Sequence, residues 1–156
     1  MTIEEHRRPA AASADGLAAL PAWARELLRE TRVGRLGLVD DDGAPRVLPV
    51  TFAVAEGAVW SVVDHKPKRP GEPARVHWLR ERPQVALCVD VYDDDWSRLA
   101  WVQLLGPVEV LALADGDAGL AALSERYPAY RERRPPGPLL RLEPERILHW
   151  RAAEGS

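Results

Sequence analysis

The chain has 156 residues, a formal net charge of −3 and one cysteine, Cys88. The length fits a single domain with a buried core, and a pI of about 5.8 argues against a general nucleic-acid binder, which carries a basic face. One cysteine excludes an internal disulfide and a cysteine-based zinc site, and no apolar run reaches the roughly 18 residues of a membrane helix.

The start of the chain predicts a tail followed by a helix. Residues 1–19 have no apolar periodicity, and small residues follow Pro9, so we expect a mobile tail there. The first eight residues lack the apolar core of a signal peptide, which predicts a cytoplasmic protein. Pro21 favours the first turn of a helix that continues to Glu30. The apolar face of this helix is predicted to hold Trp23, Leu27 and Leu28.

Three predicted strands and two tight turns follow the helix. The turns are Asp42-Gly43 and Glu56-Gly57, because glycine accepts the positive φ angles of a hairpin turn. The apolar runs around these turns predict strands over residues 34–39, 46–55 and 58–63. Strands joined by such short turns pair antiparallel.

The second half of the chain predicts further strands separated by short helices. Helices are expected over residues 73–82 and 115–126, the second capped by Asp115 or Asp117. Gly106-Pro107 predicts a bend within a long strand. The strands are expected over residues 84–91, 99–113, 139–143 and 146–151.

This count of six or seven antiparallel strands, without β-α-β alternation, predicts a mainly β domain with short helices. Long strands with a bend are typical of a small closed or split antiparallel β-barrel. We expect the domain to span residues 20–151, followed by a tail over residues 152–156.

A cluster of cations follows the third predicted strand. The segment Ser61–Arg69 runs from apolar residues directly into Lys66, Lys68 and Arg69. Positive charge concentrated in an acidic chain suggests a small anionic ligand such as a phosphate. Lys66 and Lys68 alternate along the chain, so they point the same way when it is extended. A solvated basic loop is the alternative interpretation.

The predicted sheet carries other groups that could join such an anion site. Arg35 and Arg46 are cations on neighbouring strands, and Thr51 and Ser61 offer hydroxyls. A planar cofactor would lie on the barrel wall with its phosphate toward Lys66 and Lys68.

Other chemistry finds little support in the sequence. The four histidines show no metal-ligand spacing, and no nucleophile motif or phosphate-binding glycine loop is present. Cys88 lies in an apolar run and is expected in the core. The acidic run Asp90–Asp95 could hold a divalent cation, but it lacks the spacing of a calcium loop, which favours a solvated loop.

The order and spacing of several segments resemble the pyridoxamine 5′-phosphate oxidase-like superfamily. Members are flavin or deazaflavin proteins with an FMN-binding-type split β-barrel. The segments at residues 64–68 and 92–96 are most similar to the branch of coenzyme F420-dependent oxidoreductases. The resemblance rests on residues 35–39, 42–52, 64–69, 82–90, 92–96 and 101–106.

The resemblance implies a homodimer with two cofactors in clefts between the subunits. Lys66 and Lys68 would hold the cofactor phosphate with Arg69 nearby, and Arg46 would lie at the cleft. Trp96 would approach the cofactor from the other subunit. The ring would lie against two strands, through Pro49, Val50 and Thr51 on one and Ser61, Val62 and Val63 on the other.

The activity implied by the resemblance is hydride transfer between coenzyme F420 and a small unsaturated organic substrate, without a catalytic side chain. An FMN-dependent oxidoreductase and a non-catalytic flavin- or deazaflavin-binding protein are the alternatives, and a structural dimer without a ligand is a further one. No nucleic-acid or membrane partner is expected. The chain departs from its relatives at Pro70–Pro73, which interrupts the helix that supports the phosphate loop.

Overall fold

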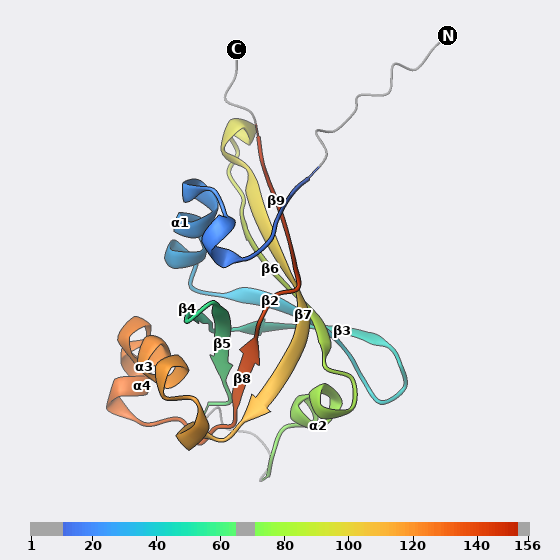
Figure 1. Ribbon diagram of the computed structural model, residues 1–156, viewed down its shortest axis with the longest axis vertical. Helices are drawn as coiled ribbons and strands as arrows, with labels where there is room; N and C mark the ends of the chain where they lie inside the picture. Colours follow the sequence, from blue (N-terminus) through green and yellow to red (C-terminus); the bar gives the residue numbers. More distant parts are fainter. Residues whose placement is uncertain (1–10, 65–70, 153–156) are drawn as a thin grey trace.

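The computed structural model describes residues 11–64 and 71–152, and within them the chain forms an antiparallel strand system with short helices around it (Figure 1). The expected mainly β fold is confirmed. The described residues contain the strands β1 (Ala12–Ala14), β2 (Gly34–Val39), β3 (Pro45–Val50), β4 (Ala53–Ala55), β5 (Ala58–Val62), β6 (Gln84–Val91), β7 (Ala100–Leu111), β8 (Leu139–Leu142) and β9 (Arg146–Arg151). The α-helices there are α1 (Ala22–Glu30), α2 (Ala74–Glu81), α3 (Asp117–Arg126) and α4 (Pro128–Glu132).

None of the helices in these ranges is long and apolar enough to cross a membrane.

Two groups of strands meet along β7, which produces the split barrel. β3, β2 and β6 lead to one edge of β7, whereas β4, β5 and β8 lead to the other. On that second edge, β9 pairs with residues 100–105 and β8 pairs with residues 108–111. The strand therefore changes partner at Gly106-Pro107, where the sequence predicts a bend.

Gly106 allows this change of partner. A Cβ atom at position 106 would lie 2.9 Å from the carbonyl oxygen of Glu143 and 3.0 Å from the backbone nitrogen of Glu145. Both atoms belong to the connection between β8 and β9, and the Glu145 N–H donates to the carbonyl of Leu105 at 2.9 Å. A side chain at this position would push the two backbones apart.

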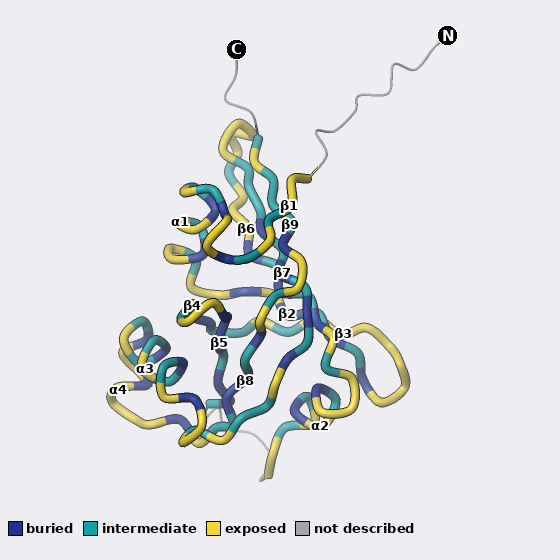
Figure 2. Tube along the Cα trace, viewed as in Figure 1, coloured by how far each residue is buried: buried dark blue, intermediate teal, exposed yellow. Residues whose placement is uncertain are grey.

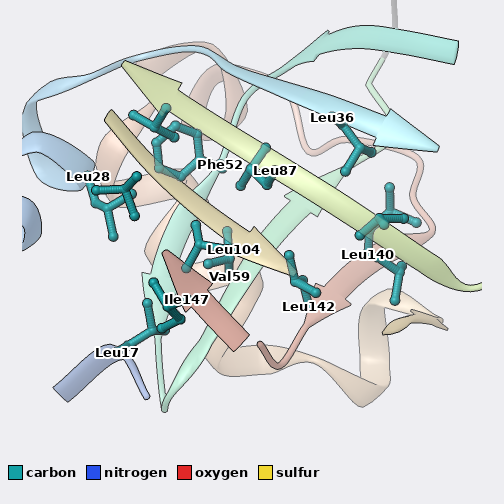
Figure 3. Packing of buried hydrophobic residues seen from close by; sticks show 14 of the residues in the cluster. Leu17, Leu28, Leu36, Phe52, Val59, Leu87, Leu104, Leu140, Leu142 and Ile147 are labelled. Carbon is teal, nitrogen blue, oxygen red and sulfur yellow. The ribbon is translucent and has the colours of Figure 1, made fainter. Parts of the chain in front are cut away.

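The main core fills the space between the strand groups and α1 (Figure 3). Phe52, Leu104 and Ile147 are completely buried there. The helix α1 contributes Leu28, and Trp23 packs against the same cluster at its margin. The apolar face expected for this helix is therefore confirmed.

A second cluster lies between β5 and the helices α3 and α4, around the buried ring of Trp60. Gly119 brings α3 against that ring, since a Cβ atom at position 119 would lie only 2.2 Å from ring atoms. The Trp60 Nε1–H donates to the carbonyl of Ala55 at 3.0 Å, which satisfies the polar end of the ring.

The prediction of a single strand over residues 46–55 is wrong. β3 pairs with β2, whereas β4 pairs with β5 in the other strand group. Thr51 and Phe52 lie between them, and the burial of Phe52 in the main core turns the chain from one group to the other. The described residues hold nine strands rather than six or seven because of this break and because of β1.

The predicted helix cap and the predicted tail also need correction. The N-cap of α3 is Gly116, without a side-chain cap bond, rather than Asp115 or Asp117. A Cβ atom at Gly116 would lie 2.9 Å from Trp60, so the packing leaves no room for a capping side chain. Residues 12–19 do not form a mobile tail, because β1 pairs with β9 and Leu17 is buried in the core.

Candidate functional site

A small hollow, part of it open to solvent, lies where β3 ends, beside β5 and the start of α2. Its wall combines apolar side chains with two hydroxyls, one carboxyl group and one guanidinium group. The lining residues are Pro49, Val50, Thr51, Ser61, Val62, Asp64, Arg75 and Leu140.

The break between β3 and β4 creates this hollow. The backbone of Phe52 has no partner strand. Its N–H instead donates to the Tyr127 hydroxyl at 3.1 Å. The same hydroxyl lies 3.0 Å from the Phe52 carbonyl and donates to the carbonyl of Arg32 at 2.8 Å. The Tyr127 hydroxyl thus provides hydrogen-bond partners for backbone groups that have no partner strand where the chain turns.

A chain of hydrogen bonds runs along the polar wall of the hollow. The Thr51 Oγ1 and Tyr130 Oη atoms lie 2.7 Å apart, and the Tyr130 hydroxyl donates to Asp64 Oδ2 at 3.4 Å. The Ser61 hydroxyl donates to the Thr51 carbonyl at 2.7 Å. Burial raises the pKa of Tyr130, so its hydroxyl keeps its proton at neutral pH.

Arg75 supplies positive charge to the hollow from the first turn of α2. This helix begins after Pro73 and is held to the core by the completely buried side chains of Val76 and Leu79. Among the described lining residues Arg75 is the only cation. Its guanidinium group can therefore pair with an anionic ligand that enters beside β5.

The hollow has an apolar space beneath it, inside the barrel. That space is lined by Leu36, Phe52, Val59, Leu87, Val108 and Leu142, and it shares Val50, Ser61 and Leu140 with the hollow above. The three shared residues therefore place the apolar interior of the barrel directly next to the polar wall of the hollow.

The structure brings together five of the residues expected at the site: Pro49, Val50, Thr51, Ser61 and Val62 all line the hollow. Pro49 and Val50 belong to β3, Ser61 and Val62 belong to β5 in the other strand group, and Thr51 follows the end of β3. Lys66, Lys68 and Arg69, which the resemblance implies at the cofactor phosphate, lie outside the described residues.

The other expected residues lie elsewhere in the subunit. Arg46 pairs with Asp40, with nitrogen and oxygen 3.5 Å apart, and its guanidinium carbon lies 5.0 Å from the centre of the Trp78 ring. Val63 is buried, and its backbone N–H and carbonyl bond to the segment Gly137-Pro138, so neither group is available to a ligand. Trp96 is 71% exposed after the end of β6.

Sequence reasoning did not name four residues of this region as site residues: Asp64, Arg75, Leu140 and Tyr130. Asp64 and Leu140 line the hollow, whereas Tyr130 contacts Thr51 without lining it. Leu140 and Tyr130 carry no local signal, because they come from positions far along the chain. Arg75 is partly exposed and lines the hollow from α2. Its position just before the inward-facing Val76 is the one signal that could have indicated this placement.

The donor set of the hollow fits some cofactors better than others. Its described lining holds no histidine, cysteine or methionine, the usual side-chain ligands of a heme iron. No group of potential metal-binding side chains occurs among the described residues. An apolar wall, hydroxyls and one guanidinium group fit a planar organic ring that carries an anionic end.

Three comparisons with solved structures show the same fold. The chain is similar to a conserved hypothetical protein from Mycobacterium tuberculosis, with 20% identity over 88% of each chain and a TM-score of 0.69. It is similar to a FAD-binding protein from Mesorhizobium loti, with 22% identity over 89% of this chain and 96% of the other and a TM-score of 0.60. It is also similar to a heme-binding protein from Mycobacterium smegmatis, with 20% identity over 88% of this chain and 57% of the other and a TM-score of 0.67.

The search of curated proteins found no match. The family model for pyridoxamine 5′-phosphate oxidase, in contrast, matches residues 20–151, a segment that contains both strand groups and every lining residue of the hollow. The chain therefore belongs to the pyridoxamine 5′-phosphate oxidase family of split-barrel proteins.

Proposed function

We propose that this chain binds coenzyme F420 in the hollow beside β5 and transfers a hydride between that cofactor and a small unsaturated organic substrate. An FMN-dependent oxidoreductase is the alternative within the same class. The observation that carries the proposal is the lining of the hollow, which combines apolar side chains from β3 and β5 with the guanidinium group of Arg75 and the carboxyl group of Asp64.

The residues of the hollow would bind and orient the cofactor. Pro49, Val50 and Val62 would offer apolar side chains to a ring, and Arg75 would offer a charge-assisted bond to its anionic end. When bound, the deazaflavin or flavin ring supplies the hydride chemistry. The chain contributes orientation and the exclusion of water on the barrel side, so no catalytic side chain is needed.

Two solved relatives favour different cofactor classes, since one is a FAD-binding protein and another is a heme-binding protein. The described lining of the hollow offers hydroxyl, carboxylate and guanidinium groups but no imidazole or sulfur atom. This donor set supports a flavin-type ring rather than an iron porphyrin.

A run of cations in the sequence supports the deazaflavin over FMN. Coenzyme F420 has an acidic oligoglutamate tail in addition to its phosphate, and Lys66, Lys68, Arg69 and Arg75 are close in the sequence. We expect Lys68→Ala to weaken cofactor binding by about 1.5–3 kcal/mol, as for the loss of a charge-assisted bond. An unchanged dissociation constant would refute a phosphate contact by Lys68.

We also propose that the chain forms a homodimer in which each hollow is completed by the partner subunit. Supporting this, Val47 in the edge strand β3 is 68% exposed and Trp96 is 71% exposed in the single chain. Both are large apolar side chains that a partner subunit would cover.

The experiment that tests the proposed function is a titration of the purified protein with coenzyme F420, with FMN and with hemin, each followed by ligand or tryptophan fluorescence. We expect the deazaflavin to bind most tightly. Binding of FMN alone would support the alternative, tight binding of hemin alone would contradict the flavin class, and binding of none would support a structural dimer. Turnover of quinone acceptors by the reduced, loaded protein then separates an enzyme from a cofactor carrier.

A further inference from the structure

The direction of the hydrogen bonds in the polar wall determines which ligand groups the hollow can accept. Ser61 Oγ lies 2.7 Å from the Thr51 carbonyl, and a carbonyl can only accept, so the single hydroxyl proton of Ser61 is used within the chain. Toward the hollow, Ser61 is left with oxygen lone pairs and no proton.

The hydroxyl proton of Thr51 is also used within the chain, in the contact of Thr51 with Tyr130. The Tyr130 hydroxyl has one proton, and its oxygen lies 3.4 Å from Asp64 Oδ2, an atom of a carboxylate that can only accept. The 2.7 Å contact between Thr51 Oγ1 and Tyr130 Oη then needs a proton from Thr51, because Tyr130 has no second one. In the opposite arrangement, lone pairs of the tyrosine oxygen would face the carboxylate, which is unfavourable at this distance.

Both hydroxyls of the hollow are therefore acceptors toward a ligand. A carbonyl or carboxylate oxygen placed against them would meet lone pairs and lose its hydration without a replacement, which costs free energy. We propose that the hollow recognises a hydrogen-bond donor of its ligand, an N–H or O–H group, and that Thr51 is the residue that determines this specificity. This inference rests on the proposed function.

Tyr130 is a positioning residue in this arrangement. It is 9% exposed, belongs to α4 and does not line the hollow, so it acts on the ligand only through the orientation of the Thr51 hydroxyl. Its bond to Asp64 fixes which partner donates. Removing the tyrosine hydroxyl would release the Thr51 proton, which could then turn toward the ligand.

In a flavin-type ligand the donor has two sources, the imide N–H of the ring and the hydroxyls of the sugar-alcohol chain. The probes are FMN, its N3-methyl analogue and its 2′-deoxy analogue, each titrated against the wild type and Thr51→Val. Valine has the shape of threonine, so steric effects of the added methyl group cancel between the two proteins. If FMN does not bind and the deazaflavin does, the same two changes are made on the deazaflavin.

We expect Thr51→Val to weaken binding of the parent ligand about three- to tenfold, the effect of one neutral hydrogen bond. The analogue that lacks the recognised donor should bind wild type and Thr51→Val equally, which identifies the source. Thr51→Ser should restore binding of the parent, and Tyr130→Phe should reduce the preference for parent over analogue, with little effect on thermal stability.

Two results would overturn the inference in different ways. If a flavin or deazaflavin binds but Thr51→Val weakens the parent and both analogues to the same extent, the donor specificity is wrong while the proposed function stands. If neither cofactor binds the wild type, the inference and the proposed function fail together.

Discussion

Individual side chains at the break between β3 and β4 carry a large part of the stability of this site. The Tyr127 hydroxyl accepts from the buried Phe52 N–H and donates to the carbonyl of Arg32. We expect Tyr127→Phe to destabilise the fold by about 1–3 kcal/mol, because a buried backbone N–H loses its partner. Urea unfolding of the variant measures this, and a midpoint equal to the wild type would contradict it.

Asp40 makes a second residue-scale prediction, which concerns pH. Its carboxylate accepts from the Ala44 and Asp42 N–H groups in the β2–β3 turn and pairs with Arg46. The Ala44 bond is the main cause that lowers the pKa of Asp40 below its usual value of 3.8. A lowered folded-state pKa means that this stabilisation is present above pH 3.8 and is lost as the pH falls through the folded-state value.

We therefore expect the stability difference between wild type and Asp40→Asn to shrink on acidification from pH 5 to pH 2. Asparagine can still accept in the turn, so the variant isolates the charge. Urea unfolding at each pH gives the comparison, and a difference that stays constant over this range would rule the assignment out.

Several residues could be predicted from the sequence and others could not. Glycine positions in turns were evident because Gly43 and Gly57 need positive φ, at 77° and 71°. Thr51 and Tyr130 are in contact although they are 79 residues apart in the sequence, and neither residue type predicts which residue it contacts. Sequence reasoning therefore found the strands that line the hollow but not the helix residue that orients the Thr51 hydroxyl.

At the scale of elements, packing overrides local preference in α3. Alanine is a better helix former than glycine by about 1 kcal/mol, so helix propensity alone predicts that Gly119→Ala stabilises the protein. A Cβ atom there would lie 2.2 Å from the Trp60 ring, which is buried and cannot move aside. We expect a net loss of about 1–3 kcal/mol from overpacking.

Thermal unfolding of Gly119→Ala tests this, and Ala121→Gly is the matched control, since Ala121 is exposed on the same helix. The control should lose only the propensity difference of about 1 kcal/mol. A higher melting temperature for Gly119→Ala than for the wild type would show that α3 does not pack on Trp60 as described.

The apolar pattern of a segment does not always predict where a strand ends. Residues 46–55 have one continuous apolar pattern, yet the chain leaves the sheet at Thr51 and enters the other strand group at Ala53. The chain changes strand group here because Phe52 is buried in the core between strands that are distant in sequence. The bend at Gly106-Pro107 was predictable because both residues disfavour a regular ladder.

At the scale of the whole molecule, the exposed edge of the sheet predicts the assembly. Figure 2 shows that most of β3 is exposed, in contrast to the largely buried strand β5. We expect Val47→Asp to convert a dimer into monomers, read by sedimentation, and to weaken cofactor binding because the hollow loses its partner. Val54→Asp, on the partly exposed β4, is the control and should leave the dimer intact. A wild type that sediments as a monomer would contradict the proposal.

The measurement that tests the central claim most directly is the dissociation constant of coenzyme F420 for Arg75→Ala beside that for Arg80→Ala. Both arginines belong to α2, but Arg75 lines the hollow whereas Arg80 pairs with Glu72 at the surface. If the hollow is the cofactor site, Arg75→Ala should bind about tenfold more weakly and Arg80→Ala should bind like the wild type. Equal affinities for the two variants would contradict the placement of the cofactor in this hollow.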